Sequence, residues 1–173
     1  MPKAVVVKDS KIHGKGVFAI RDFGEGDLVL ELDDSHPVPD RSKLTPEQSK
    51  YEIDVFIDKG GNEKVVLAQS PERYINHSCD PNLLVKTDLR SGIRRVYALR
   101  KIRRGDEITW DYFLNAWEKW EVPLECKCGS PNCRRILSGN FFTLPSDVLR
   151  RWIPLLDGPF KKRFKDQIDR ISQ

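Results

Sequence analysis

Residues 73–82 read RYINHSCDPN, a stretch in which asparagine, histidine, serine, cysteine and aspartate stand close together around a proline. Side chains of these types do not bury easily along a β-strand, so we expect them to bond to the local backbone or to a ligand. Taken alone, the stretch is also typical of an ordinary polar turn. Its meaning therefore depends on motifs elsewhere in the chain.

A cluster of cysteines lies downstream, where residues 126–133 read CKCGSPNC. Two thiols separated by one residue can hold one ion from both sides of a tight turn, and Gly129 and Pro131 provide the turn that returns Cys133 to it. Structural zinc has four tetrahedral ligands, so this knuckle lacks one, and Cys79 is the thiol that remains. Two disulfides are the alternative, which an intracellular chain disfavours. We therefore predict a structural zinc ion with the ligands Cys79, Cys126, Cys128 and Cys133.

The length and charge of the chain limit the classes of protein to which it can belong. A chain of 173 residues usually supports a single hydrophobic core, with room for a terminal appendage. The formal charge of +4 favours acidic surfaces or nucleic-acid-bound proteins only mildly. The sequence has no apolar run of the length that a signal peptide or a membrane span requires, so we expect an intracellular protein without a membrane partner.

Short strand-like segments dominate the first two thirds of the chain and predict a mostly β fold with short helices, of the α+β class. The long periodic helices of a doubly wound fold are missing there. Residues 33–50 form a polar insert, in which Thr45, Pro46 and Glu47 can open a short helix because proline is tolerated at the first helical position. The predicted strands are residues 4–7, 16–20, 28–32, 51–57, 64–68, 83–87, 94–99 and 107–112.

The pattern becomes helical after the cysteine cluster. Ser146 can cap a helix that Pro154 ends. Four apolar residues then repeat at near-helical spacing beside a run of basic residues, which predicts an amphipathic helix packed on the domain with a solvated basic face. A contact with substrate or DNA is the other interpretation of this face. The four apolar residues are Phe160, Phe164, Ile168 and Ile171.

Four motifs stand in one order along residues 5–137: HGKGVFA at 13–19, NHSC at 76–79, GDEITWDY at 105–112 and the cysteine knuckle. Together they resemble the SET-domain family of protein lysine methyltransferases with its post-SET four-cysteine zinc segment. A Gly-x-Gly pair alone is weak evidence, whereas four ordered motifs are specific. The resemblance implies a SET-domain, β-clip-like fold in which a C-terminal segment is threaded against the NHSC motif. It also implies a SET domain over residues 1–115, a post-SET zinc segment over 116–138 and a C-terminal helical extension over 139–173.

The resemblance further implies a protein-lysine N-methyltransferase that uses S-adenosylmethionine. Tyr112 matches the catalytic tyrosine. The substrate would be a lysine-bearing protein, such as a histone or another DNA-associated protein, and nucleic acid would be contacted only weakly or indirectly. We expect a monomer that is cytoplasmic in a prokaryote and otherwise nuclear. The residues that match the cofactor site are His13, Gly14, Lys15, Gly16, Tyr51, Arg73, Asn76 and His77.

Two positions in the substrate channel depart from the family pattern. Trp110 stands where relatives carry phenylalanine or tyrosine, and its larger ring should leave less room for a growing methylammonium. Leu32 stands where relatives often carry a second channel tyrosine. A substitute for its hydroxyl, or a slower enzyme, is then expected. The channel is assigned to Trp110, Leu32, Tyr74 and Phe113, with Tyr97 as a further candidate for the substitute.

Two other functions compete with the enzyme. One is a catalytically weak SET-like module that only binds a protein, which the missing channel tyrosine favours. A small zinc-knuckle protein that binds nucleic acid through Lys127, Arg134, Arg135 and the basic helix is the other. Two features argue against the nucleic-acid binder. The net charge of the chain is modest, and its aromatic residues do not interleave with the basic ones as single-strand binders require.

Overall fold

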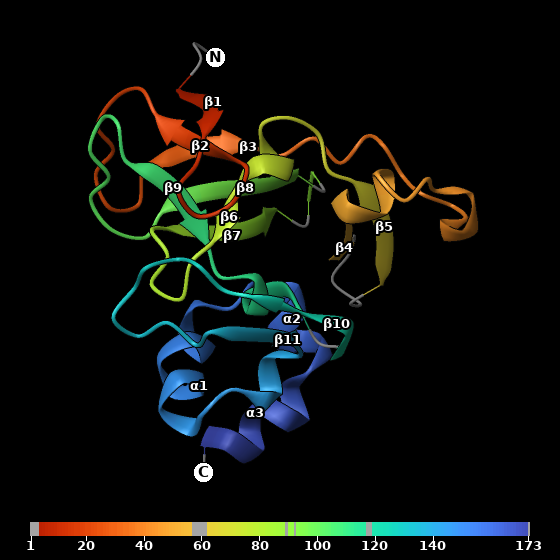
Figure 1. Ribbon diagram of the computed structural model, residues 1–173. Coiled ribbons are helices and arrows are strands. Elements are labelled where there is room, and N and C mark those ends of the chain that lie inside the picture. The colour runs from red at the N-terminus through yellow and green to blue at the C-terminus, as the bar shows by residue number, and fades with distance from the viewer. Residues whose placement is uncertain (1–3, 57–61, 89, 92, 117–118, 173) are drawn as a thin grey trace.

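The computed structural model of the protein describes residues 4–56, 62–88, 90–91, 93–116 and 119–172. Strands occupy the upper part of the molecule in Figure 1, and the C-terminal helices lie below them. In the described part of the chain, no helix has both the length and the apolar character needed to span a bilayer.

One sheet joins segments from both ends of the first 110 residues. It contains β1 (Val5–Asp9), β2 (Lys15–Ala19), β9 (Glu107–Trp110) and β6 (Asn76–His77), in that order. The pairs β1–β2 and β2–β9 are antiparallel, whereas β6 runs parallel to β9. The sheet therefore places the NHSC motif beside the strand that leads to Tyr112, which is the juxtaposition that the family resemblance implied.

A second sheet and a hairpin complete the upper part. The second sheet has the order β3 (Leu28–Glu31), β8 (Ile93–Ala98), β7 (Leu83–Asp88), and all its pairs are antiparallel. The hairpin of β4 (Glu52–Phe56) and β5 (Glu63–Leu67) lies to the right of the two sheets in Figure 1. A core of apolar side chains from β2, β3, β8 and β9 and from nearby loops holds the two sheets together.

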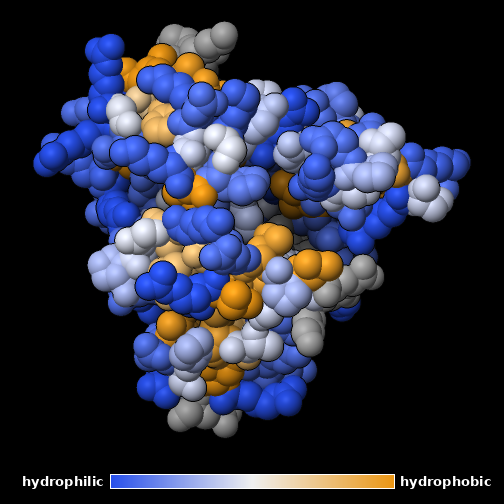
Figure 2. All heavy atoms as spheres, in the orientation of Figure 1, coloured by the Kyte–Doolittle hydropathy of each residue, from blue (hydrophilic) through white to orange (hydrophobic). Residues whose placement is uncertain are grey.

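The lower part begins with the hairpin of β10 (Lys119–Glu125) and β11 (Ile136–Gly139). Three short helices follow: α1 (Ser146–Trp152), α2 (Gly158–Arg163) and α3 (Lys165–Ser172). Figure 2 shows that apolar side chains gather in the middle and lower part of this face, whereas the right side, over the insert and the β4–β5 hairpin, is largely hydrophilic.

A second core fills the lower part and includes two of the cysteines. Cys79 and Cys126 are buried in it with Phe113, Trp152 and Phe160. The helices are also bonded to the upper part, because the carboxylate of Asp157 accepts hydrogen bonds from the backbone N–H and hydroxyl of Thr87. The C-terminal helices are therefore packed and bonded to the strands and do not stand apart from them.

The mostly β fold with short helices is confirmed, and all eight predicted strands are present, with ends displaced by at most two residues. Residue 57, the end of one predicted strand, lies outside the described residues. Asn76 and His77 correct the expectation that polar side chains would not bury in a strand. They form β6 and are buried there because β9 and its neighbours provide hydrogen-bond partners.

The helical predictions need three corrections. The insert forms 3-10 turns at Arg41–Lys43 and Gln48–Tyr51, so no helix begins at Pro46. Ser146 is the first residue of α1, and its side chain does not cap the helix because Pro145 occupies the cap position. The amphipathic segment forms two helices, since the backbone at Phe164 leaves the helical region at φ −110° and ψ 26°.

Candidate functional site

The turn between β1 and β2 depends on two glycines. Gly14 has a φ of +45°, in the left-handed region where glycine carries no steric penalty. At Gly16 the backbone approaches a neighbour closely, because an added Cβ would lie 2.2 Å from Oε1 of Glu107 and 2.9 Å from Cβ of Ser10. The turn predicted to hold the cofactor is thus packed against Glu107 at Gly16. At Gly14 it is open, because a Cβ added there would meet no neighbouring atom within 4 Å.

Asn76 fastens this turn to the central sheet. Its side-chain amide donates hydrogen bonds to the main-chain oxygens of Lys15 at 3.0 Å and His13 at 3.3 Å. It also donates to Oε1 of Glu107 at 2.8 Å, and the hydroxyl of Ser10 donates to the same carboxylate. The structure therefore brings the glycine turn and the NHSC motif together through Glu107.

Sequence reasoning quoted Glu107 within a motif but gave it no role. The only signal was its place inside GDEITWDY at the start of β9. An acidic residue at the start of a strand is usually solvated, so its bonds to Ser10 and Asn76 could not be anticipated.

His77 and Tyr112 form the centre of the site. The backbone N–H of Tyr112 donates to Nδ1 of His77 at 3.1 Å, and the two rings meet edge to face with centroids 5.2 Å apart. Burial, and secondarily the nearby charge of Arg134, lowers the pKa of His77 to about 3. The imidazole is therefore neutral near pH 7 and able to accept this hydrogen bond.

The hydroxyl of Tyr112 points at the backbone of the segment before β6. It donates a hydrogen bond to the main-chain oxygen of Ile75 at 3.0 Å. Burial raises the pKa of Tyr112 to about 12. At neutral pH the phenol is therefore a protonated donor, fixed beside the backbone that leads into the NHSC motif.

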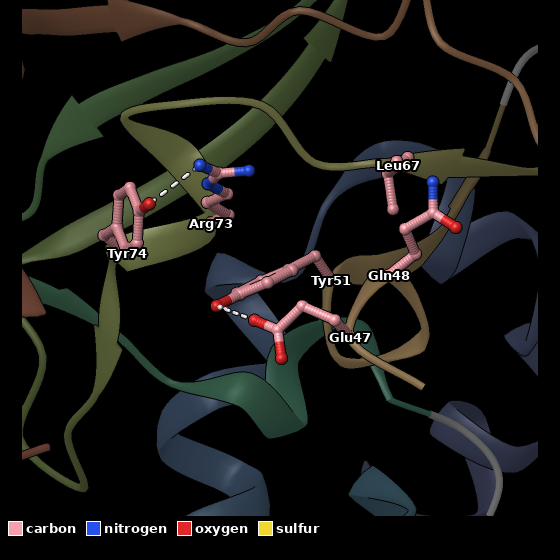
Figure 3. A pocket seen from close by; sticks show the side chains of 6 residues that line it. All are labelled: Glu47, Gln48, Tyr51, Leu67, Arg73 and Tyr74. Carbon is pink, nitrogen blue, oxygen red and sulfur yellow. Dashed lines mark hydrogen bonds between the residues drawn. The ribbon is translucent and has the colours of Figure 1, made fainter. Parts of the chain in front are cut away.

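A pocket of about 220 Å³ opens between the insert and the 3-10 turn that precedes β6. In Figure 3, Tyr51 and Glu47 face Tyr74 and Arg73 across it. The Tyr51 hydroxyl donates to Glu47 at 3.3 Å, and Arg73 donates to the Tyr74 hydroxyl at 2.8 Å. Two predicted cofactor residues, Tyr51 and Arg73, thus share a pocket with the predicted channel residue Tyr74, and Gln48 completes its rim.

The other channel residues fall into two groups. Leu32 is buried in the upper core, and Tyr74 and Trp110 pack against the same core. Phe113 is 2% exposed and lies in the lower core, where its ring contacts Trp120. Tyr97 lies on β8 opposite Leu84 and is not among the residues that line the pocket of Tyr51 and Arg73. The structure therefore groups Leu32, Tyr74 and Trp110 and separates them from Phe113.

The four thiols form a compact cluster. Their sulfur atoms all lie within 4.8 Å of one another, and the sulfurs of Cys79 and Cys126 are 3.8 Å apart. Zinc bound to sulfur at about 2.3 Å in a tetrahedron requires a sulfur separation of about 3.8 Å. Burial raises the pKa of the Cys79 thiol to about 11. A metal cation would hold such a thiol ionised, so the donor set and its spacing fit structural zinc.

Comparisons with known proteins agree with this geometry. The sequence model of the SET domain matches residues 14–113. Human histone-lysine N-methyltransferase 2B is 34% identical over 79% of this chain, and the H3 lysine-4 specific histone-lysine N-methyltransferase of Saccharomyces cerevisiae is 31% identical over 79%. The chain spans only 5% and 13% of the length of these relatives.

A solved structure is similar over the same extent. The crystal structure of KRYPTONITE in complex with mCHG DNA and SAH is 27% identical, with a TM-score of 0.60 over 79% of this chain and 29% of that one. The match to the SET-domain model covers more than half of the 173 residues, and the matched segment contains the glycine turn, Asn76, His77 and Tyr112. The chain therefore belongs to the SET-domain family.

Proposed function

We propose that the protein is a lysine methyltransferase that uses S-adenosylmethionine to modify a protein substrate. The observation that carries the proposal is the convergence of three motifs on one site: the glycine turn bonded to Asn76, the ring of His77 bonded to the backbone of Tyr112, and the hydroxyl of Tyr112 directed at Ile75. Relatives named histone-lysine N-methyltransferases and a related structure that contains SAH, the demethylated form of the cofactor, support it.

When bound, S-adenosylmethionine would supply a methyl group on a positively charged sulfur. The turn of residues 13–16 would contact its methionine portion through backbone groups, which the open space at Gly14 allows. Asn76 would hold that turn in place, and the backbone of His77 would bind the adenine. Tyr51 and Arg73 would complete the site from the pocket beneath the insert.

The reacting amine must lose its proton before it attacks. A lysine amine has an ordinary pKa of about 10.4, and desolvation together with a nearby cation lowers it. The protonated hydroxyl of Tyr112 would orient the amine, and the main-chain oxygens of Arg73 and Ile75 would attract the polarised methyl hydrogens. Positioning would then supply much of the acceleration, and no covalent bond to the enzyme is needed.

We infer a histone or another DNA-associated protein as the substrate and chromatin as the place of action. The names of the relatives support this substrate class, and the DNA in the KRYPTONITE complex supports proximity to nucleic acid. The protein itself would act as a monomer that contacts DNA weakly.

The channel would favour the addition of few methyl groups. Trp110 packs against the same core as Leu32, where its indole would narrow the space around the amine. Tyr74, which packs there too, would supply the hydroxyl that Leu32 lacks. If Tyr74 does not replace the missing hydroxyl, the protein would be a module that binds a protein without turnover.

Calorimetry and a methyl-transfer assay test the proposal on zinc-loaded protein. S-adenosylmethionine should bind to the wild type and to Tyr112→Phe but not to Asn76→Ala, and only the wild type should methylate histone H3 or its peptides. Folded wild type that binds no cofactor would refute the methyltransferase. Cofactor binding without transfer to any histone would refute the histone substrate and favour another protein.

A further inference from the structure

Arg134 follows the last cysteine of the knuckle, yet its side chain turns inward. Its Nη2 donates to Oδ1 of Asp111 at 2.7 Å and lies 3.3 Å from Nε2 of His77. The guanidinium also lies over the ring of Phe113, 4.8 Å from its centroid. The side chain is only 14% exposed, which corrects its assignment to a nucleic-acid surface and leaves Arg135 as the exposed basic neighbour.

Asp111, the partner of Arg134, is adjacent in sequence to the predicted catalytic tyrosine. Asp111 separates Trp110 from Tyr112, and its Oδ1 accepts the backbone N–H of Phe113 at the start of the turn that carries Tyr112. The carboxylate has no exposed surface. Burial raises the pKa of Asp111 and the charge of Arg134 opposes that rise. A buried carboxylate of this kind requires a bonded cation to remain ionised.

The main chain of the same residue is bonded to the cysteine cluster. The N–H of Arg134 donates to the sulfur of Cys79 at 3.3 Å. One residue therefore joins the cluster, through its backbone, to Asp111 and the ring of His77, through its side chain. Such partners of metal ligands typically fix the orientation of nearby groups.

We propose that Arg134 is a positioning residue through which the zinc knuckle sets the orientation of Tyr112. The inference rests on the proposed function. Arg134 would contact neither methyl donor nor acceptor, and acts by holding Asp111, which lies beside His77. Asp111 and His77 in turn accept the backbone N–H groups of Phe113 and Tyr112. The knuckle thereby stabilises the catalytic turn as well as its own fold.

The test compares Arg134→Met, which keeps an apolar stem of similar length, with Arg135→Met as the matched control. Zinc content, the affinity for S-adenosylmethionine, kcat and KM for a histone H3 peptide are measured for each. In Arg134→Met, kcat should fall by about 10- to 100-fold, while zinc content and KM change by less than about twofold. Arg135→Met should match the wild type.

A double variant separates positioning from charge neutralisation. Asp111→Asn with Arg134→Met removes both buried charges and keeps an oxygen that can accept the N–H of Phe113. It should melt close to the wild-type temperature but retain the low kcat. Because this variant leaves no unpaired charge, it keeps the test decisive even if Arg134→Met alone does not fold.

Three results would overturn the inference: wild-type kcat in Arg134→Met, an equal loss in Arg135→Met, or a kcat restored in the double variant. Each of these requires an active wild type. A folded, zinc-loaded wild type that transfers no methyl group to any protein instead removes the proposed function, and the role of Arg134 with it.

Discussion

The hydroxyl of Tyr112 donates a hydrogen bond to the main-chain oxygen of Ile75, 3.0 Å away, and so connects the end of β9 to the segment that enters β6. Tyr112→Phe removes this hydroxyl and keeps the ring against His77. We expect the affinity for S-adenosylmethionine to stay within about twofold while kcat falls by about 100- to 1000-fold, as for the loss of one oriented donor. Calorimetry and single-turnover transfer measure the two effects, and a parallel loss of affinity would contradict the assignment.

Gly16 packs against Glu107 too closely for a side chain. In Gly16→Ala the new Cβ would lie 2.2 Å from Oε1 of Glu107, so the carboxylate must move away from Asn76. We expect the affinity for S-adenosylmethionine to fall by about tenfold, equivalent to about 1.4 kcal/mol. Gly158→Ala is the control, because no atom lies within 4 Å of a Cβ there. Equal affinities of the two variants would refute the role of this contact.

Arg94 pairs with two carboxylates, the buried one of Glu72 and the largely buried one of Asp34. It donates to Oδ2 of Asp34 and to Oε1 of Glu72, both at 2.8 Å, and its side chain is 6% exposed. Arg94→Met leaves these carboxylates unpaired, so the free energy of unfolding should fall by about 3–5 kcal/mol near pH 7. Arg95→Met removes half-exposed ion pairs with Glu31 and Asp88 and should cost less than about 1 kcal/mol.

The loss in Arg94→Met should depend on pH. Burial already raises the pKa of Glu72 in the wild type. A carboxyl whose pKa is raised by folding stabilises the native state below its ordinary pKa, and this contribution disappears as the pH rises through the folded pKa. Without the cation the pKa of Glu72 rises further. Urea unfolding should therefore show a deficit that shrinks from about pH 7 to about pH 4.5, and a constant deficit would contradict this account.

Trp110 offers a test of how many methyl groups are added. In Trp110→Tyr the smaller ring should widen the channel, so mass spectrometry of the product peptide should show a larger share of di- and trimethyl-lysine. Ile102→Val, which changes the same core at a residue outside the assigned channel, should leave the product distribution unchanged. Identical products from wild type and Trp110→Tyr would remove Trp110 from the channel.

The strands could be predicted because their alternation is local, whereas the pairings that make the site are not. Ser10 and Glu107 are 97 residues apart, and nothing near either position indicates the other. The two-residue strand β6 exists because β9 lies parallel to it. The strand β10 was not predicted; it contains Pro123, which cannot donate to a ladder, and its register against β11 is irregular.

The sequence also does not show which basic side chains are exposed, because their contacts are with residues distant in the chain. Arg134 and Arg135 are adjacent and look alike in the sequence, but only one is turned toward a buried carboxylate. The cluster of four cysteines was predictable from ligand count, because a zinc knuckle with three thiols requires a fourth. No count of ligands predicts the bond from Arg134 to Asp111. It is seen only in the folded structure, where the knuckle lies against the end of β9.

Removal of zinc should loosen the two cores unequally. Cys79 and Cys126 are buried in the lower core with Trp152, whereas the upper core contains no thiol among its described residues. Metal binding is coupled to folding, so a chelator, or Cys126→Ser, should lower the melting temperature. Hydrogen exchange should rise strongly in β10, β11 and α1 and little in β2 and β8. A chelator should have no further effect on Cys126→Ser.

The distribution of hydrogen exchange after zinc removal shows whether the two cores unfold separately or together. Polar bonds such as those from Thr87 to Asp157, Lys86 to the main chain of Leu155 and Arg134 to Asp111 cross between the parts, whereas each part has an apolar core of its own. Local unfolding usually follows such units of packing. If β2 and β8 exchange as fast as β11 once zinc is removed, the two cores unfold together, and the knuckle then stabilises the whole molecule and not the lower core alone.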